Sequence, residues 1–318
     1  RPEIERILYS TGDESPEMVT ALSEGSCMLV NKCVDASAVG DGIRLISSAP
    51  RQFAMSNYAR SGLSYISFCC ERSVVGRKAV RQAIAYCLDK DQMVKDYVGN
   101  YGLRSDGYYG LGQWMYQLVD GTQVYPLEVP DESADSATVA AYDEALASWQ
   151  ALSLENVRVY DLNVDEAVNL LVSEGWTLNR EGEAYNPETD DVRCKAAEDG
   201  TIQALELKML CPENSSMNAG VEDYFTANLA QAGILLNVQV LPMQELLQHY
   251  YRGVERDCDM IMLATNFDVV FEPSIYFMPD TDEHIGSVHR FVYFSHCNVC
   301  RQYCWKIVEI PCDGNGRD

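Results

Sequence analysis

The clearest pattern along the chain runs from Arg77 to Gly102, where apolar residues recur at steps of three and four. This spacing places them on one side of a helix, so the stripe is expected to face a core. Asp89 and Gln92 are typical of an N-cap and its N3 partner, and the glycines at Gly99 and Gly102 end the pattern. We therefore predict a helix, a short break and a second helix. The stripe consists of Val80, Ile84, Cys87, Leu88, Val94 and Val98.

Before this segment, the pattern predicts a small β-α-β unit and then an isolated strand. Ile4–Ser10 and Cys27–Val30 are predicted strands, and Ser15-Pro16 begins a helix that ends at Gly25. The apolar run Gly62–Phe68 predicts a further strand.

After Gly102, strands alternate with helices. We expect a helix around Ala137–Leu152, and Asn163 with Glu166 resembles a capping box that opens another. Residues 180–200 lack periodicity and indicate a β-turn or a hairpin excursion. Strands are predicted at 205–209, 234–241 and 258–263, with helices at 221–233 and 242–253 between them. Alternation of this kind predicts an α/β fold with a mostly parallel sheet flanked by helices.

Three segments also resemble one protein family. VRQAIAYCLDKDQMVKDYVGNYG at 80–102, YDLNVDEAVNLLVSEGW at 160–176, and the strand–helix run Leu205–Phe277 occur in that family's order. The chain resembles the extracellular solute-binding proteins of family 5, which deliver oligopeptides, dipeptides or nickel to ABC importers. The resemblance covers roughly residues 60–275 and implies a type II periplasmic-binding-protein-like lobe. It implies a binding protein and not an enzyme, with a peptide or similar small solute as ligand and no cofactor.

The same resemblance implies a domain organisation. Residues 1–62 would be a remnant of the first lobe up to the hinge, 63–275 the second lobe, and 276–318 an atypical tail. We therefore expect a fragment that lacks most of the first lobe and, ahead of Arg1, an export or lipoprotein signal. The expected location is extracellular, as a cell-surface lipoprotein or in a periplasm. An ABC permease and ATPase would be the partners, and only a lipid anchor absent from this chain would contact the membrane.

Charge narrows the possible partners. The 318 residues contain 24 Lys and Arg against 48 Asp and Glu, which gives a net charge of −24 and a pI near 4.4. Such a chain is repelled by phosphate backbones, so nucleic acid is not an expected partner. No stretch approaches the ~20 apolar residues of a membrane-spanning helix.

The candidate ligand anchor is Asp268, just after the last predicted strand. Loops at the carboxyl ends of strands hold the ligands of open α/β sheets. The resemblance implies that this acid holds the α-ammonium of a bound peptide. Spacing to Glu272-Pro273 is one residue wider than in the family, and Ala264-Thr265 stands where the family usually has Trp. The alternative is a solvated loop acid or a helix cap.

Aromatic residues between Tyr101 and Tyr125 could line the cleft, because ligand sites combine apolar walls with a few polar groups. Equally, such residues pack well at lobe surfaces. The best candidates are Tyr108, Tyr109 and Trp114, followed by Asn266, Phe267 and Tyr65.

Of the 12 cysteines, eight are dispersed and are interpreted as small buried apolar residues. The other four, Cys297, Cys300, Cys304 and Cys312, lie near His289 and His296. These are residue types of a zinc or iron–sulfur site, but the spacing matches no complete template, so no metal site is assigned. A shifted reading frame or truncation near residue 285 explains the change in composition better than a metal site does, and simple disorder is the alternative for a tail without periodicity. An α/β enzyme or metal protein that uses this tail is the alternative function. No GxGxxG, P-loop or G-x-S-x-G motif occurs.

Overall fold

The structure is a computed structural model that describes residues 4, 6–10, 15–31, 33, 36–72, 74–99, 102–123 and 127–267. Two compact units divide the chain. Arg1–Tyr58 with Asp91–Arg104 form the first, and Ala59–Lys90 with Ser105–Asp318 form the second. The division into lobes at residue 62 stays a prediction.

The first unit is helical. Helices α1 (Ser15–Glu24) and α2 (Ala36–Ser48) pack against each other, and most of α4 (Lys90–Val98) belongs to the same unit. The predicted helix after Ser15 is confirmed, but the predicted strands at Ile4–Ser10 and Cys27–Val30 are wrong. The amides of Ser26 and Cys27 bind the carbonyl of Ala21, so this backbone closes the end of α1. The helix α2 was not predicted, because two glycines weaken its pattern.

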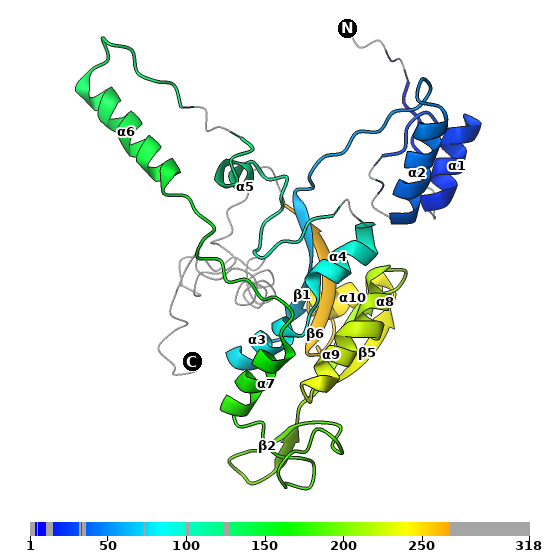
Figure 1. Ribbon diagram of the computed structural model, residues 1–318, viewed down its shortest axis with the longest axis vertical. Coiled ribbons are helices and arrows are strands. Elements are labelled where there is room, and N and C mark those ends of the chain that lie inside the picture. Colours follow the sequence, from blue (N-terminus) through cyan, green and yellow to red (C-terminus); the bar gives the residue numbers. More distant parts are fainter. Residues whose placement is uncertain are drawn as a thin grey trace. The chain divides into compact units, whose positions relative to one another are not determined.

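The second unit contains a four-stranded sheet in the order β1-β6-β4-β5, drawn in Figure 1. Its strands are β1 (Gly62–Phe68), β4 (Glu206–Pro212), β5 (Leu235–Leu241) and β6 (Met260–Asn266). The strand β4 runs parallel to both β5 and β6, whereas β1 pairs antiparallel with β6. The predicted α/β fold with a mostly parallel sheet is therefore confirmed, with one antiparallel strand at its edge.

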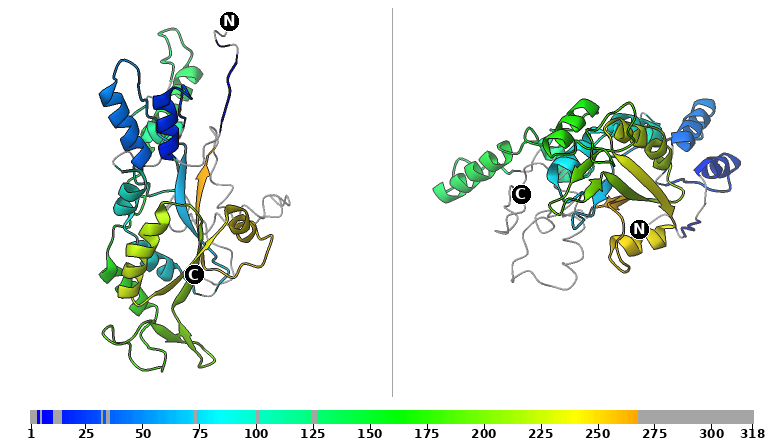
Figure 2. Two further views of the ribbon diagram at one scale, coloured as in Figure 1. Left: turned by 90° about the vertical axis from the view of Figure 1, so that its right-hand side faces the viewer. Right: turned by 90° about the horizontal axis from the view of Figure 1, so that it is seen from below.

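Helices cover both faces of this sheet (Figure 2). Helix α10 (Met243–Tyr250) lies on one face, and α3 (Lys78–Tyr86), α7 (Val164–Ser173) and α9 (Thr226–Gln231) lie on the other. The chain moves outward from β4 to β5 and then back past β4 to β6. The connection from β4 to β5 contains α9, and the connection from β5 to β6 contains α10. Because the two connections cross the sheet in opposite directions and both are right-handed, α9 and α10 lie on opposite faces.

Alternating side chains of the strands form two cores. Tyr65 and Ile261 face α10 together with Leu210, and the next residues along each strand point to the opposite face. Under α3, the predicted stripe is buried from Val80 to Leu88, and α3 packs on α7. The prediction that this stripe faces a core is thus confirmed for α3.

The remaining elements surround this sheet. The side chain of Asn163 accepts a hydrogen bond from the amide of Glu166, which confirms the predicted cap of α7. The helix expected near Ala137 is α6 (Ser136–Gln150). The excursion expected at 180–200 contains β2 (Cys194–Ala196), which pairs with β3 (Ile202–Ala204) just after it. The described part of the unit also contains three short helical segments: α5 (Trp114–Val119), α8 (Met217–Gly220) and η2 (Val221–Phe225).

None of the helices in the described part of the chain combines the length and apolar character that a membrane span needs.

Candidate functional site

The carboxyl ends of the three parallel strands lie together at one end of the sheet, which we call the carboxyl edge. These ends are Pro212 of β4, Leu241 of β5 and Asn266 of β6. The strand order reverses at β4, because β5 lies on one side of it and β6 on the other. Ligands of open α/β sheets bind outside the carboxyl ends at such a reversal, so this edge is the candidate site.

The loop 105–113 is held against the segment that leads into β1. The amide of Gly112 donates to the carbonyl of Arg60 over 2.8 Å. A Cβ at Gly110 would lie 2.3 Å from the backbone carbon of Ser61, and one at Gly112 would lie 2.2 Å from the carbonyl oxygen of Ala59. Only glycine permits this approach of two backbones. At the start of the loop, Lys90 forms an ion pair with Asp106.

The side chain of Tyr108 extends from the loop into the core. Its ring is 3% exposed and packs edge-on against Tyr65 and Phe267, with ring centroids 6.2 and 5.0 Å away. The hydroxyls of Tyr65 and Tyr250 lie 3.0 Å apart, and burial raises the pKa of Tyr65. Three of the sequence candidates, Tyr108, Phe267 and Tyr65, therefore pack in the core next to the carboxyl edge and do not form its surface.

Two other candidates lie at the surface. Trp114, the first residue of α5, is 41% exposed, and Asn266 is exposed at the end of β6. Asn266 Oδ1 accepts a hydrogen bond from Arg60 Nη2 over 2.8 Å. This bond, with the one between Gly112 and Arg60, links the loop 105–113, called the aromatic loop below, to the end of β6.

Tyr109 is half-buried beside this surface. Its ring stacks on that of Tyr116, with centroids 4.9 Å apart and planes at 17°. Burial, with a smaller contribution from the charge of Asp120, raises the pKa of Tyr116. The two rings thus form a neutral apolar platform next to Trp114 in the sequence.

Gln113 supplies an uncommitted donor in the same loop. Its side chain is 3% exposed, and its Oε1 accepts from the amide of Gly110 over 2.8 Å. Its Nε2 is buried and has no acceptor among the residues that the structure describes. A buried amide donor without a partner is costly, so an acceptor brought to this position would be bound favourably.

The remaining candidate, Asp268, lies outside the described residues, directly after Phe267. The amide of Phe267 donates to the carbonyl of Ser61 over 2.9 Å, so the described backbone stays attached to this edge up to that residue. The cysteines and histidines from His289 to Cys312 also lie outside the described residues. Within the described part, no three His, Cys, Asp or Glu side chains group as metal ligands do.

Sequence reasoning missed Arg60 and Gln113, and it included Tyr116 only among the aromatic residues between Tyr101 and Tyr125, not among the best candidates. Arg60 reaches Asn266 because β1 pairs with β6 in the register that sets Gly62 opposite Asn266. That register depends on long-range pairing and leaves no local signal. Gln113 and Tyr116 flank Trp114, and the glycines of the loop were the signal that could have drawn attention to them.

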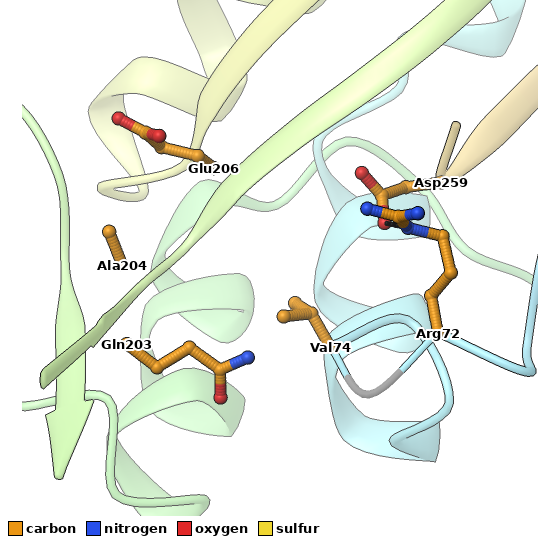
Figure 3. A pocket seen from close by; sticks show the side chains of 6 residues that line it. All are labelled: Arg72, Val74, Gln203, Ala204, Glu206 and Asp259. Carbon is orange, nitrogen blue, oxygen red and sulfur yellow. Dashed lines mark hydrogen bonds and ion pairs between the residues drawn. The ribbon is translucent and has the colours of Figure 1, made fainter. Parts of the chain in front are cut away.

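A pocket of about 480 Å³ lies near the opposite edge of the sheet, at the beginning of β4 (Figure 3). Arg72 Nε donates to Asp259 Oδ1 over 2.7 Å, and Asp259 Oδ2 accepts from the amide of Lys208 over 2.8 Å. Figure 3 shows the Arg72 guanidinium lying across this carboxylate, while Glu206 points away from Gln203. Because its central charges already satisfy each other, this pocket is the weaker candidate for a ligand site.

Solved structures share this fold at low sequence identity. The oligopeptide-binding protein AppA of Bacillus subtilis, in complex with a nonapeptide, has a TM-score of 0.54 at 13% identity, covering 91% of this chain and 51% of that one. Lactococcal OppA, complexed with an endogenous peptide in the closed conformation, gives 0.54 at 12% identity, with 91% and 51% covered. AppA of Clostridium difficile, described as a putative peptide-binding protein, gives 0.51 at 14% identity, with 90% and 50% covered.

The chain thus spans about half the length of these structures. No curated protein matches it in sequence. The family model for bacterial extracellular solute-binding proteins, family 5 Middle, matches residues 1–286. Because this match covers most of the 318 residues, the chain belongs to the bacterial extracellular solute-binding proteins of family 5.

Proposed function

We propose that this chain captures a peptide or a similar small solute as part of the substrate-binding component of an ABC importer. The observation that carries the proposal is the pair of contacts from Arg60 to Gly112 and to Asn266, which gathers polar and aromatic side chains at the carboxyl edge. Members of the family are extracellular or periplasmic binding proteins, and the matched structures of Bacillus subtilis AppA and lactococcal OppA hold peptides.

The side chains at this edge suit a peptide. Trp114 offers a flat apolar surface for a side chain of the solute. Asn266 and Arg60 offer polar groups for its backbone or carboxylate, and Gln113 Nε2 offers a donor for a carbonyl that reaches into the loop. A few placed polar groups among apolar walls are typical of small-molecule sites.

Asp268 completes the proposed site. By family resemblance, its carboxylate holds the α-ammonium of the peptide through a charge-assisted hydrogen bond. Its support is its place in the sequence, directly after Phe267, which follows the end of β6. An anion there also agrees with the net charge of −24, which favours cationic groups and disfavours nucleic acid.

The proposed mechanism is capture by closure. Contacts from two lobes favour a closed state, and only contacts that differ between the open and closed states shift that equilibrium. A permease and its ATPase would read the closed state, so no covalent step is assigned to the chain. Retention at the cell surface through a lipid anchor, or release into a periplasm, belongs to the same proposal.

Isothermal titration of the full-length protein with a pool of short peptides tests this function. The wild type should bind, whereas Trp114→Ala, Asn266→Ala and Asp268→Asn should each weaken binding about tenfold or more, roughly the loss of one good contact. Asn237→Ala is the matched control, because Asn237 is exposed in the middle of β5 and away from the carboxyl edge. Equal binding by all five proteins, or no binding by the wild type, would refute the proposal.

A further inference from the structure

Two cysteines far apart in sequence meet at the end of the sheet opposite the candidate site. Cys69 directly follows β1, and Cys258 precedes β6. Because β1 and β6 run antiparallel, the end of one lies beside the beginning of the other. The amide of Cys69 donates to the carbonyl of Asp259 over 2.8 Å, which extends the pairing beyond both strands. The two Sγ atoms lie 3.8 Å apart, although 189 positions separate the residues.

Both thiols belong to the core under α10. Cys69 is 1% exposed and Cys258 is 0% exposed, and both pack in the cluster that contains Tyr65 and Ile261. Buried thiols of this kind are usually small apolar residues. This pair differs from a single buried cysteine because its two sulfur atoms approach each other across two paired strands.

We propose that Cys69 and Cys258 form a disulfide bond when the protein is in an oxidising compartment. The sulfurs would move from 3.8 Å to the ~2.0 Å of an S–S bond, which rotation of two short side chains can provide on a backbone already held by β1 and β6. Bacterial proteins outside the cytoplasm meet conditions that form and preserve disulfides. The bond would fasten β1 to β6 at the end away from Asn266 and leave the carboxyl edge free.

The environment favours Cys258 as the attacking thiol. Its hydrogen bond with Cys69 lowers the pKa of Cys258, and the nearby guanidinium of Arg256 acts in the same direction. Arg256 is held in place by the carbonyl of His249 and the carboxylate of Glu71. The pKa of Cys69 is raised by the same hydrogen bond and by burial, so Cys69 keeps its proton at first.

The oxidant is a dithiol–disulfide oxidoreductase of the export route, acting after β1 and β6 have paired, so that Cys69 and Cys258 already lie together, and before the core under α10 closes over both thiols. The thiolate of Cys258 attacks the oxidant's disulfide, forms a mixed disulfide and releases one thiolate of the oxidant. Cys69 then loses its proton and attacks Sγ of Cys258, and the second thiolate of the oxidant leaves. Two protons and two electrons leave the chain, and the oxidant is reduced to a dithiol.

Peptide mapping of the exported full-length protein tests the bond. Free thiols are blocked with N-ethylmaleimide under denaturing conditions, and trypsin then releases residues 61–72 and 257–290. We expect these peptides to be recovered as one linked species that carries one N-ethylmaleimide on Cys70, is otherwise two hydrogen masses lighter than the sum of the two peptides, and separates on reduction. Recovery of both peptides unlinked, with Cys69 and Cys258 alkylated, would overturn the proposal.

Variants separate Cys69 from its neighbour Cys70, since both lie in the first peptide. The link should be lost in Cys69→Ser and Cys258→Ser and kept in Cys70→Ser; if Cys69→Ser fails to fold, Cys69→Ala replaces it. A link that persists without Cys69 would contradict the assignment. The oxidised wild type should also unfold several degrees above Cys258→Ser, and a reductant should reduce this difference by lowering the Tm of the wild type only. Each result is independent of whether the protein binds peptide.

Discussion

Arg60 donates a hydrogen bond from Nη2 to Oδ1 of Asn266 across 2.8 Å, joining residues 206 positions apart. The bond connects the segment before β1 with the end of β6, at the edge where the aromatic loop also meets Arg60. Both side chains are exposed, so its contribution to stability is modest, but it fixes the position of the Asn266 amide.

A double-mutant cycle should detect this bond. Arg60→Met and Asn266→Ala, measured singly and together by urea unfolding, are expected to show a coupling energy of about 0.5–1 kcal/mol. The matched pair Arg60→Met and Asn237→Ala, in which the asparagine lies in mid-strand, should be additive. Additivity in both pairs would show that the Arg60–Asn266 bond does not persist in solution.

Removal of the Tyr108 ring should mainly lower stability, whereas removal of the Trp114 ring should mainly weaken peptide binding. Tyr108→Ala empties a buried ring position between Tyr65 and Phe267 and should lower the free energy of unfolding by about 3–5 kcal/mol. Tyr108→Phe keeps the ring and should cost far less. Trp114→Ala, at a residue 41% exposed, should cost under about 1 kcal/mol but weaken peptide binding. Denaturant unfolding and titration on the same preparations measure both effects, and an equal stability loss at the two positions would contradict the assignment.

The loop needs glycine where it touches the segment before β1. Gly110→Ala would bring a methyl group to 2.3 Å from backbone atoms, which must shift, and should cost about 1–3 kcal/mol. Gly42→Ala in α2 is the control, because no atom lies within 4 Å of its added Cβ and alanine favours helix. Thermal unfolding should show a lower Tm for the first variant only. An unchanged Tm for Gly110→Ala would mean that the loop is not held against β1.

The ion pair of Asp257 and Lys208 should make a small, pH-dependent contribution to stability. Lys208 Nζ lies 2.7 Å from Asp257 Oδ2, and this hydrogen bond lowers the pKa of Asp257. Since the folded pKa lies below the unfolded one, the stabilisation is present above about pH 4 and is lost as the pH falls through the folded pKa. Asp257 is 58% exposed, so Asp257→Asn should cost about 0.5 kcal/mol or less at pH 7.

Urea unfolding of wild type and Asp257→Asn between pH 7 and pH 3 measures this contribution. The difference between the two proteins should shrink with acid, and also at 1 M salt, which screens exposed charges. A difference that stays constant across the pH range would exclude the Asp257 carboxylate as its source.

Much of the second unit could be predicted from local patterns. The cap at Asn163, the stripe around Ile84 and the alternation of short strands with helices each indicate an element, and right-handed crossovers then give a parallel sheet. The strands expected at Ile4–Ser10 and Cys27–Val30 failed because a strand needs a partner, and the apolar pattern of a single segment does not supply one.

The candidate site was harder to predict for the same reason. An aromatic in a glycine-rich loop can face a ligand or the core, and Tyr108 is buried whereas Trp114 is exposed although they are only six positions apart. Their burial depends on where the loop meets β1, and that contact is made by backbone atoms of Arg60 and Gly112. The resemblance of the motifs identified the family, whereas the geometry of the edge required the structure.

Native mass spectrometry of the full-length protein, purified from its source cells, tests the capture of a solute most directly. We expect a stoichiometric complex whose released ligand is a peptide or a similar small solute, and loss of that ligand from the Trp114→Ala, Asn266→Ala double variant but not from Asn237→Ala. A wild-type protein without any bound small solute, or with a ligand retained equally by all three proteins, would contradict binding at the carboxyl edge.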